Sequence, residues 1–145
     1  MPRPNQAIWD LYIKKLKSVS AKNTVARSYI FVILYESGHT PLSMNDLLDG
    51  DSKHYGDRTT IYRTVRFFEK AGIVQRRYTG WKYKIELSDE FHGHHHHITC
   101  IKCGETHATH DDNNFETELV KLAKINGYKV TDHKLEIRGI CAKCQ

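Results

Sequence analysis

The sequence predicts an α+β protein in which an N-terminal winged helix-turn-helix is followed by a small α/β dimerisation domain with a four-cysteine zinc site. Three observations support this expectation. Helix-period apolar patterns and then two strand-like runs fill the first part of the 145-residue chain. All four cysteines form Cys-x-x-Cys pairs in the second part. Charge divides in the same way, with 15 Lys and Arg against 7 Asp and Glu in residues 1–84, and 7 against 10 in residues 85–145.

This division predicts the domain boundaries. We expect a winged-helix DNA-binding domain over residues 1–87, a polar hinge at 88–93 and a metal-binding dimerisation domain over 94–145. A basic half beside a half rich in Cys and His is typical of a polyanion-binding module joined to a metal-binding module, although charge alone fits an ordinary solvated surface equally well. With no apolar run near the roughly 20 residues of a membrane span, we expect a cytoplasmic protein.

Four helices are expected before residue 71. The apolar positions of the first two are Ile8, Leu11, Tyr12, Leu16 and Val19, then Ala26, Tyr29, Ile30, Ile33 and Leu34. Ser43 should cap a short third helix that ends at residues 49–52. A fourth helix is expected over residues 58–70, with Ile61, Val65 and Phe68 inward and Gly72 as its end.

Two strands at residues 73–78 and 82–87, joined at 79–81, complete the winged helix, whose last helix enters the major groove while the hairpin lies on phosphates. The hairpin supplies the cations Arg76, Arg77, Lys82 and Lys84. Arginine reads guanine bidentately, and hydroxyls reach phosphates or bases. The predicted DNA contacts are Arg58, Thr60, Tyr62, Arg63, Arg76 and Lys82. The alternative is that Tyr62 belongs to the core and the arginines only solvate the helix.

In the second half, strands are expected at residues 98–101 and 106–109, around the first Cys-x-x-Cys. The apolar positions Phe115, Leu119, Leu122 and Ala123 predict a helix that ends at Gly127. Alternation at 128–130 and 135–137 predicts a strand that leads into the second cysteine pair. Because this domain has little core of its own, its strands are expected to pair with a second copy.

The cysteine spacing predicts one structural zinc ion. Two Cys-x-x-Cys turns, each placing two sulfurs on one side of a metal, complete a tetrahedral shell. The ligands would be Cys100, Cys103, Cys141 and Cys144. Disulfides are the alternative, and a reducing compartment argues against them.

A run of four histidines, residues 94–97, predicts two further metal sites. In an extended segment His94 and His96 point to one side, and His95 and His97 to the other. Imidazole together with carboxylate suits Fe2+, Mn2+ or Zn2+ and does not choose between them. His54 and His92 are expected to be ordinary surface residues.

The order of these features resembles the ferric uptake regulator family of metal-dependent bacterial repressors over roughly residues 20–145. The resemblance rests on residues 60–63, 86–87, 94–97, 100–104, 132–133 and 141–144. It implies a regulatory site of Glu86, His95 and His97 between the domains. It also implies a second metal site of His94, His96, Glu116 and His133, where many relatives have Asp in place of His96. The extra imidazole favours zinc or nickel there.

Three departures from the family pattern concern the regulatory site. Relatives usually supply a histidine just before the third helix, where this chain has Pro41, with His39 two residues earlier. The usual carboxylate after the CxxCG motif is Ala108 here, flanked by His107 and His110. Glu86 also lies two residues further from the histidine run. The site is therefore expected either to be rebuilt with His39 and with His107 or His110, or to be degenerate.

The expected function is a homodimeric, metal-dependent, sequence-specific transcriptional repressor of metal-homeostasis or peroxide-stress genes. It would bind a double-stranded DNA operator, a structural Zn2+ and a regulatory Fe2+, Mn2+ or Zn2+. An enzyme is not expected, because no nucleophile remains beside a base once the cysteines bind zinc. The alternatives are a constitutive zinc-stabilised DNA-binding dimer, a metal buffer and a thiol redox protein.

Overall fold

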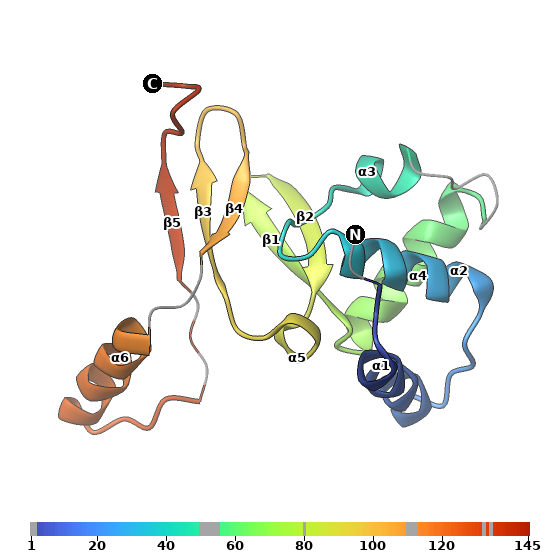
Figure 1. Ribbon diagram of the computed structural model, residues 1–145, viewed down its shortest axis with the longest axis horizontal. Helices are drawn as coiled ribbons and strands as arrows, with labels where there is room; N and C mark the ends of the chain where they lie inside the picture. Colours follow the sequence, from blue (N-terminus) through green and yellow to red (C-terminus); the bar gives the residue numbers. More distant parts are fainter. Residues whose placement is uncertain (1–2, 50–55, 80, 110–112, 132, 134) are drawn as a thin grey trace. The chain divides into compact units, whose positions relative to one another are not determined.

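The computed structural model divides into two compact units, Met1–Gly93 and His94–Gln145 (Figure 1). It describes residues 3–49, 56–79, 81–109, 113–131, 133 and 135–145. Parts of the expected turns at 49–52 and 79–81 lie outside these residues, as do His54, His110 and Asp132. Within the described ranges no helix has the length and apolar character needed to cross a membrane.

The first unit has the predicted winged helix-turn-helix order. Its elements are α1 Gln6–Ser18, α2 Val25–Glu36, α3 Met44–Asp49, α4 Arg58–Lys70, β1 Val74–Thr79, β2 Lys82–Leu87 and α5 Asp89–His92. The strands form an antiparallel hairpin in which Val74 pairs with Leu87 and Thr79 with Lys82. This element order confirms the predicted winged helix-turn-helix.

Polar side chains begin the helices where the sequence contains them. Asn5, Thr24 and Asp57 precede α1, α2 and α4, and each accepts a hydrogen bond from a backbone N–H of the first turn. Ser43 and Asp46 form a reciprocal capping pair at α3, because each side chain accepts from the other residue's backbone N–H, at 3.2 and 2.6 Å. These caps fix the helix starts independently of packing.

An aromatic cluster forms the core of the first unit. The rings of Tyr12 and Phe31 stack with centroids 4.2 Å apart, and Phe68 meets Tyr12 edge-on at 6.0 Å. Phe91 is only 4% exposed and its ring lies 5.2 Å from that of Phe31. The segment expected to be a polar hinge at 88–93 therefore contains the short helix α5, which is anchored by this phenylalanine. Val19, expected on the apolar face of the first helix, is its C-cap and is 42% exposed.

The second unit is a three-stranded sheet with one helix. Its elements are β3 His96–Cys100, β4 Thr106–Thr109, α6 Asn113–Ile125 and β5 Glu136–Gly139, with strand order β4-β3-β5. The expectation of a strand at 128–130 is wrong. Residues 128–130 belong instead to the connection between α6 and β5, which pairs in parallel with β3. Gly127, at φ 79°, ends α6 and lets Tyr128 N–H bond to the Ala123 carbonyl.

The second unit lacks an apolar core of its own in the part of the chain that is described. Every residue of the hydrophobic cluster lies at or before Phe91, and Cys100 is the single buried apolar residue among the described residues beyond it. Large apolar side chains are instead exposed, such as Leu122 at 60%, Ile125 at 82% and Ile137 at 45%. Short domains without a core usually depend on metals or on oligomerisation. Metal binding is therefore expected to be a main source of this unit's stability.

Candidate metal centres and nucleic-acid interface

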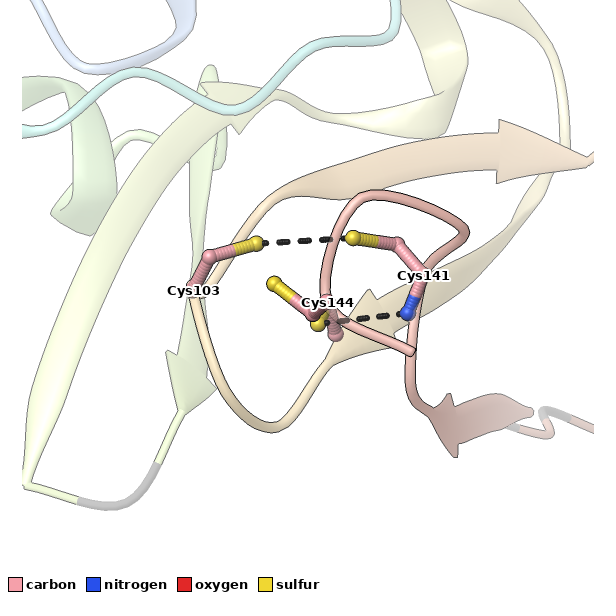
Figure 2. Close-up of side chains that lie close together, drawn as sticks. Cys103, Cys141 and Cys144 are labelled. Atoms are coloured by element: carbon pink, nitrogen blue, oxygen red, sulfur yellow. Dashed lines mark hydrogen bonds between the residues drawn. The ribbon is translucent and has the colours of Figure 1, made fainter.

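Cys100, Cys103, Cys141 and Cys144 come together in the second unit, and we call them the four-cysteine cluster. Figure 2 shows three of them, Cys103, Cys141 and Cys144, with their sulfurs directed toward one another. All four sulfurs lie within 4.8 Å of one another, and Cys103 Sγ is 3.8 Å from Cys141 Sγ. A tetrahedral zinc ion with Zn–S bonds of about 2.3 Å separates its sulfurs by roughly 3.8 Å. A disulfide requires about 2.05 Å, and all four cysteines are free thiols. The cluster fits a closed structural zinc site.

Hydrogen bonds within the four-cysteine cluster make its thiols unequal. The Cys141 backbone N–H donates to Cys100 Sγ at 3.4 Å. This hydrogen bond is the main cause that lowers the pKa of Cys100 to about 6. Hydrogen bonding with Cys141 and then with Cys103 raises the pKa of Cys144 to about 12. Several thiolates so close together repel one another unless a cation lies between them. A divalent ion would supply that charge.

A second group in the same unit, which we call the histidine–glutamate cluster, combines His94, His96, Glu116 and His133. One carboxylate oxygen, Glu116 Oε1, lies 3.0 Å from His96 Nε2, 2.8 Å from His133 Nε2 and 3.4 Å from His94 Nε2. The His94 and His133 Nε2 atoms are 3.1 Å apart. Ligand atoms around a four-coordinate zinc ion, at bonds of about 2.0–2.1 Å, are roughly 3.3 Å apart. These four side chains fit a metal with little movement.

Charge already favours an ionised Glu116 in the histidine–glutamate cluster. Burial acts to raise the pKa of Glu116, but the hydrogen bond from His96 and the charges of His133 and His94 outweigh it, so that the pKa is lowered. The carboxylate is therefore ready to bind a cation at neutral pH. His133 comes from the connection after α6, and the two other histidines come from β3 and the residues before it.

The residues expected in the regulatory site are divided between the units. In the second unit, the rings of His95 and His97 meet edge-on with centroids 4.8 Å apart. His94 and His96 form the other ring pair at 4.7 Å, as alternation along the segment predicts. In the first unit, Glu86 of β2 is 1% exposed and accepts hydrogen bonds from Gln75, at 2.9 Å, and Arg77.

The candidate replacement ligands differ in their surroundings. His39 lies in the first unit with its ring 5.2 Å from that of His92, which itself stacks on Tyr35 at 4.9 Å. His92 is thus part of a ring cluster rather than an isolated surface residue.

Strand register separates His107 from His97. His97 pairs with Ala108, whereas His107 pairs with Ile98. Paired residues of antiparallel strands share a face and neighbours alternate, so His107 points away from the face of His97. His107 Nε2 lies instead 3.2 Å from Glu105 Oε1. The position opposite His97 carries only the Ala108 methyl group, and His110 lies outside the described residues.

Helix α4 presents several of the expected DNA contacts to solvent. Tyr62 is 40% exposed, so the alternative that it belongs to the core is wrong. The Arg58 guanidinium lies 5.6 Å from the Tyr62 ring centre and 3.5 Å from its hydroxyl. Arg63 is exposed, and Thr60 is partly buried. Ile61, Val65 and Phe68 face the core as expected.

The hairpin is less cationic than its composition indicates. Arg76 forms an ion pair with Glu69 at 2.8 Å and lies over the Tyr83 ring at 4.4 Å. Arg77 is paired with Glu86. Lys82 is exposed beside the fully exposed Trp81. Of the two residues of this hairpin predicted to bind DNA, Lys82 therefore has the surroundings of a phosphate contact, whereas Arg76 has those of a structural residue. Sequence alone does not reveal these ion pairs.

Comparisons with known proteins agree on one family. A family model described as the ferric uptake regulator family matches residues 18–138. The ferric uptake regulation protein of Neisseria gonorrhoeae is 36% identical over 139 residues, covering 92% of each chain. The solved ferric uptake regulator of Vibrio cholerae is 30% identical, with a TM-score of 0.72 over 88% of this chain and 98% of that one. The Helicobacter pylori ferric uptake regulator reaches a TM-score of 0.80 over 99% and 97%; at 22% identity it supports the fold alone.

Proposed function

Since the chain belongs to the ferric uptake regulator family, we propose that it is a homodimeric, metal-dependent repressor that binds double-stranded operator DNA. Its targets would be genes of metal homeostasis or peroxide stress. The observation that carries the proposal is the pair of preassembled ligand groups, the four-cysteine and histidine–glutamate clusters, in a unit whose described residues form no apolar core. Such a unit depends on metal for its structure, so metal supply can control what the attached winged helix does.

Helix α4 would read the operator. In a winged helix the recognition helix lies in the major groove, where Arg58, Tyr62 and Arg63 are suitable reading and positioning residues. Thr60 offers a hydroxyl close to the start of the same helix. The exposed ammonium group of Lys82 would hold a phosphate from the hairpin. Two copies related by a two-fold axis would then recognise two half-sites about one helical turn apart.

Metals would have separate roles. Zn2+ in the four-cysteine cluster would hold the second unit together, and a metal in the histidine–glutamate cluster would tie α6 to β3. The regulatory metal, Fe2+, Mn2+ or Zn2+, is assigned to Glu86, His95 and His97, with His39 as a further ligand. Alternation along the histidine run and the family pattern support that assignment. A metal held by residues of both units would favour one arrangement of the winged helices through its extra affinity for it.

An enzymatic role is not proposed. The four thiols all belong to one closed cluster, which leaves no open coordination position for a substrate. The thiol redox and metal-buffer alternatives also give no reason for the exposed Tyr62 and the arginines of α4.

Selection from a pool of random duplexes tests the proposal. Zinc-loaded protein would be mixed with the pool in Mn2+, in anaerobic Fe2+, in added Zn2+, or with a chelator too weak to remove the structural zinc. We expect enrichment of one two-fold symmetric sequence, and only with added metal. No enrichment under any condition would refute the DNA-binding role. Equal enrichment with the chelator would favour a constitutive zinc-stabilised dimer instead.

A further inference from the structure

A polar pocket of about 340 Å3 lies between the first turn of α2 and one face of α4. Its polar and aromatic lining residues are Thr24, Arg27, Thr60, Arg63, Thr64 and Phe67. We propose that this pocket binds one backbone phosphate of a DNA duplex and thereby sets how α4 sits in the major groove. This inference rests on the proposed DNA-binding function and adds a site for the DNA backbone, which includes Arg63, to the reading residues Arg58 and Tyr62.

Two guanidinium groups give the pocket its charge. Arg27 lies over the Phe67 ring, 4.1 Å from its centre, and donates a hydrogen bond to the Lys22 carbonyl. These contacts hold the group in place while most of its five N–H donors are left for a ligand. Arg63 is exposed at the pocket rim. In the described part of the chain no carboxylate forms an ion pair with either arginine, so a phosphate would meet net positive charge.

Neutral donors complete the lining. Thr64 is only 7% exposed, and it belongs to the pocket lining. A threonine hydroxyl carries one O–H donor, which can bind a phosphate oxygen. Thr24 caps α2 by accepting the Arg27 backbone N–H at 3.3 Å. The first backbone N–H groups of α2, including that of Ala26 in the pocket, have no partner within the helix and attract an anion.

One acidic neighbour opposes this charge only in part. Asp57 caps α4, and its carboxylate accepts the backbone N–H of Thr60 at 2.7 Å. That hydrogen bond is the main cause that lowers the pKa of Asp57, and the nearby charge of Arg63 lowers it further. Asp57 therefore remains directed to the helix it caps, and two arginines face one carboxylate around the pocket.

Helical spacing separates this pocket from the reading face. Residues 60, 63, 64 and 67 follow the i, i+3, i+4, i+7 pattern of a single helix face, and Tyr62 does not belong to it. A phosphate held there would position α4 without carrying sequence information. Arg63, expected from the sequence to read a base, is thereby assigned to the backbone.

The test uses full-length, metal-loaded protein and three variants. Arg27→Ala removes the fixed guanidinium, and Thr64→Val removes the Thr64 hydroxyl at nearly constant volume. Lys124→Ala, in α6 of the second unit, is the matched control for loss of one positive charge. Dissociation constants would be measured by fluorescence anisotropy over a salt series, for the selected operator and for an unrelated duplex. Inorganic phosphate would be titrated separately, and near-ultraviolet circular dichroism would monitor the fold.

We expect Arg27→Ala to weaken operator and unrelated duplex by the same factor, roughly 10- to 100-fold, as for hydrogen bonds to charged groups. The slope of log affinity against log salt should become shallower by about one unit, since one phosphate contact is lost. Thr64→Val is expected to stay folded even if Arg27→Ala is destabilised. It should weaken binding to both duplexes several-fold and leave the salt slope unchanged. Lys124→Ala should change neither the affinity nor the salt slope.

Three results would overturn the phosphate assignment. The first is a loss confined to the operator, which would mean that the pocket reads bases. The second is unchanged DNA binding together with lost affinity for inorganic phosphate, which would make it a site for a free anion. The third is no effect of Thr64→Val on either ligand. If the wild-type protein selects no operator, the proposed function is refuted. Binding of the variants to the unrelated duplex, and the salt slope of that binding, would still test the pocket.

Discussion

Replacing Cys141 by serine should remove zinc and unfold the second unit while the first unit stays folded. Cys141 is central to the four-cysteine cluster, because its sulfur is 3.8 Å from that of Cys103 and its backbone N–H donates to Cys100 Sγ. Serine keeps the backbone contact and nearly the same volume. The variant therefore removes one thiolate ligand and little else.

The expected magnitude follows from the exposed apolar side chains of this unit. Structural zinc contributes about 10–16 kcal/mol of apparent binding free energy in small zinc domains, whereas whole domains are stable by only about 5–15 kcal/mol. Loss of an outer-shell partner alone weakens metal binding about 10- to 100-fold, and loss of a ligand should exceed that. With Ile125 82% exposed and Leu122 60% exposed, the described part of the unit has little apolar burial that could compensate. Metal loss and unfolding should therefore occur together.

The assay combines zinc analysis of the purified protein with hydrogen exchange resolved by residue. In Cys141→Ser, amides of β3 and β5 should exchange at the rate of unfolded chain, and amides around Phe31 and Phe68 should remain protected. Ala142→Ser is the matched control, since it introduces the same residue into the same turn without removing a ligand. Full zinc content and normal protection in Cys141→Ser would refute the assignment of the four-cysteine cluster as the structural centre of this unit.

Further predictions concern the other sites. Glu116→Gln should lower metal affinity of the histidine–glutamate cluster by at least about tenfold, measured by competition with a metal indicator, and leave the zinc of the four-cysteine cluster in place; unchanged affinity would exclude Glu116 as a ligand. Folding lowers the pKa of Asp57, chiefly through the hydrogen bond from the Thr60 backbone N–H. The ionised Asp57 carboxylate therefore stabilises the fold above the pKa that Asp57 has in the unfolded chain. This stabilisation is lost as the pH falls through the pKa that Asp57 has in the folded protein. Asp57→Ala should thus lower the melting temperature of the first unit above about pH 5, with a difference that narrows below about pH 4; a constant difference would contradict this. Lys82→Ala should weaken binding to all duplexes and reduce the salt slope by about one unit, whereas Arg76→Ala should mainly lower stability; equal salt slopes for the two variants would contradict this difference in roles.

Local chemistry explains why much of the first unit was predictable. Asp57 and Gly72 delimit α4, and the alternation of residues 82–87 matches β2 at both ends. The errors occurred where tertiary contacts decide. Phe91 lies in a polar segment, and its packing against Phe31 together with the Lys15–Glu90 ion pair ties that segment to the first unit. The strand expected at 128–130 failed because parallel pairing of β5 with β3 depends on a distant partner.

The candidate sites show the same limit. Spacing alone predicted the four-cysteine cluster, and alternation separated His94 and His96 from their neighbours. Nothing in the sequence indicates that Arg76 and Arg77 are held by carboxylates, because Glu69 and Glu86 approach them only in the folded hairpin. Strand register was likewise needed to exclude His107 from the face of His97. Arg27 was missed altogether, because its place beside α4 arises from the packing of α2 on that helix.

The most direct test of metal-dependent control compares two double variants in the same operator-binding assay, titrated with the metal that supports selection. In His95→Ala/His97→Ala we expect metal to lose its effect on DNA affinity, while the four-cysteine cluster keeps its zinc. In His94→Ala/His96→Ala, which leaves the proposed regulatory ligands in place, metal should still increase affinity in the fraction that remains dimeric. If metal increases the affinity of His95→Ala/His97→Ala as much as that of the wild type, the regulatory role of these histidines is contradicted. If both variants bind the operator like the wild type at every metal concentration, the protein is a constitutive DNA-binding dimer.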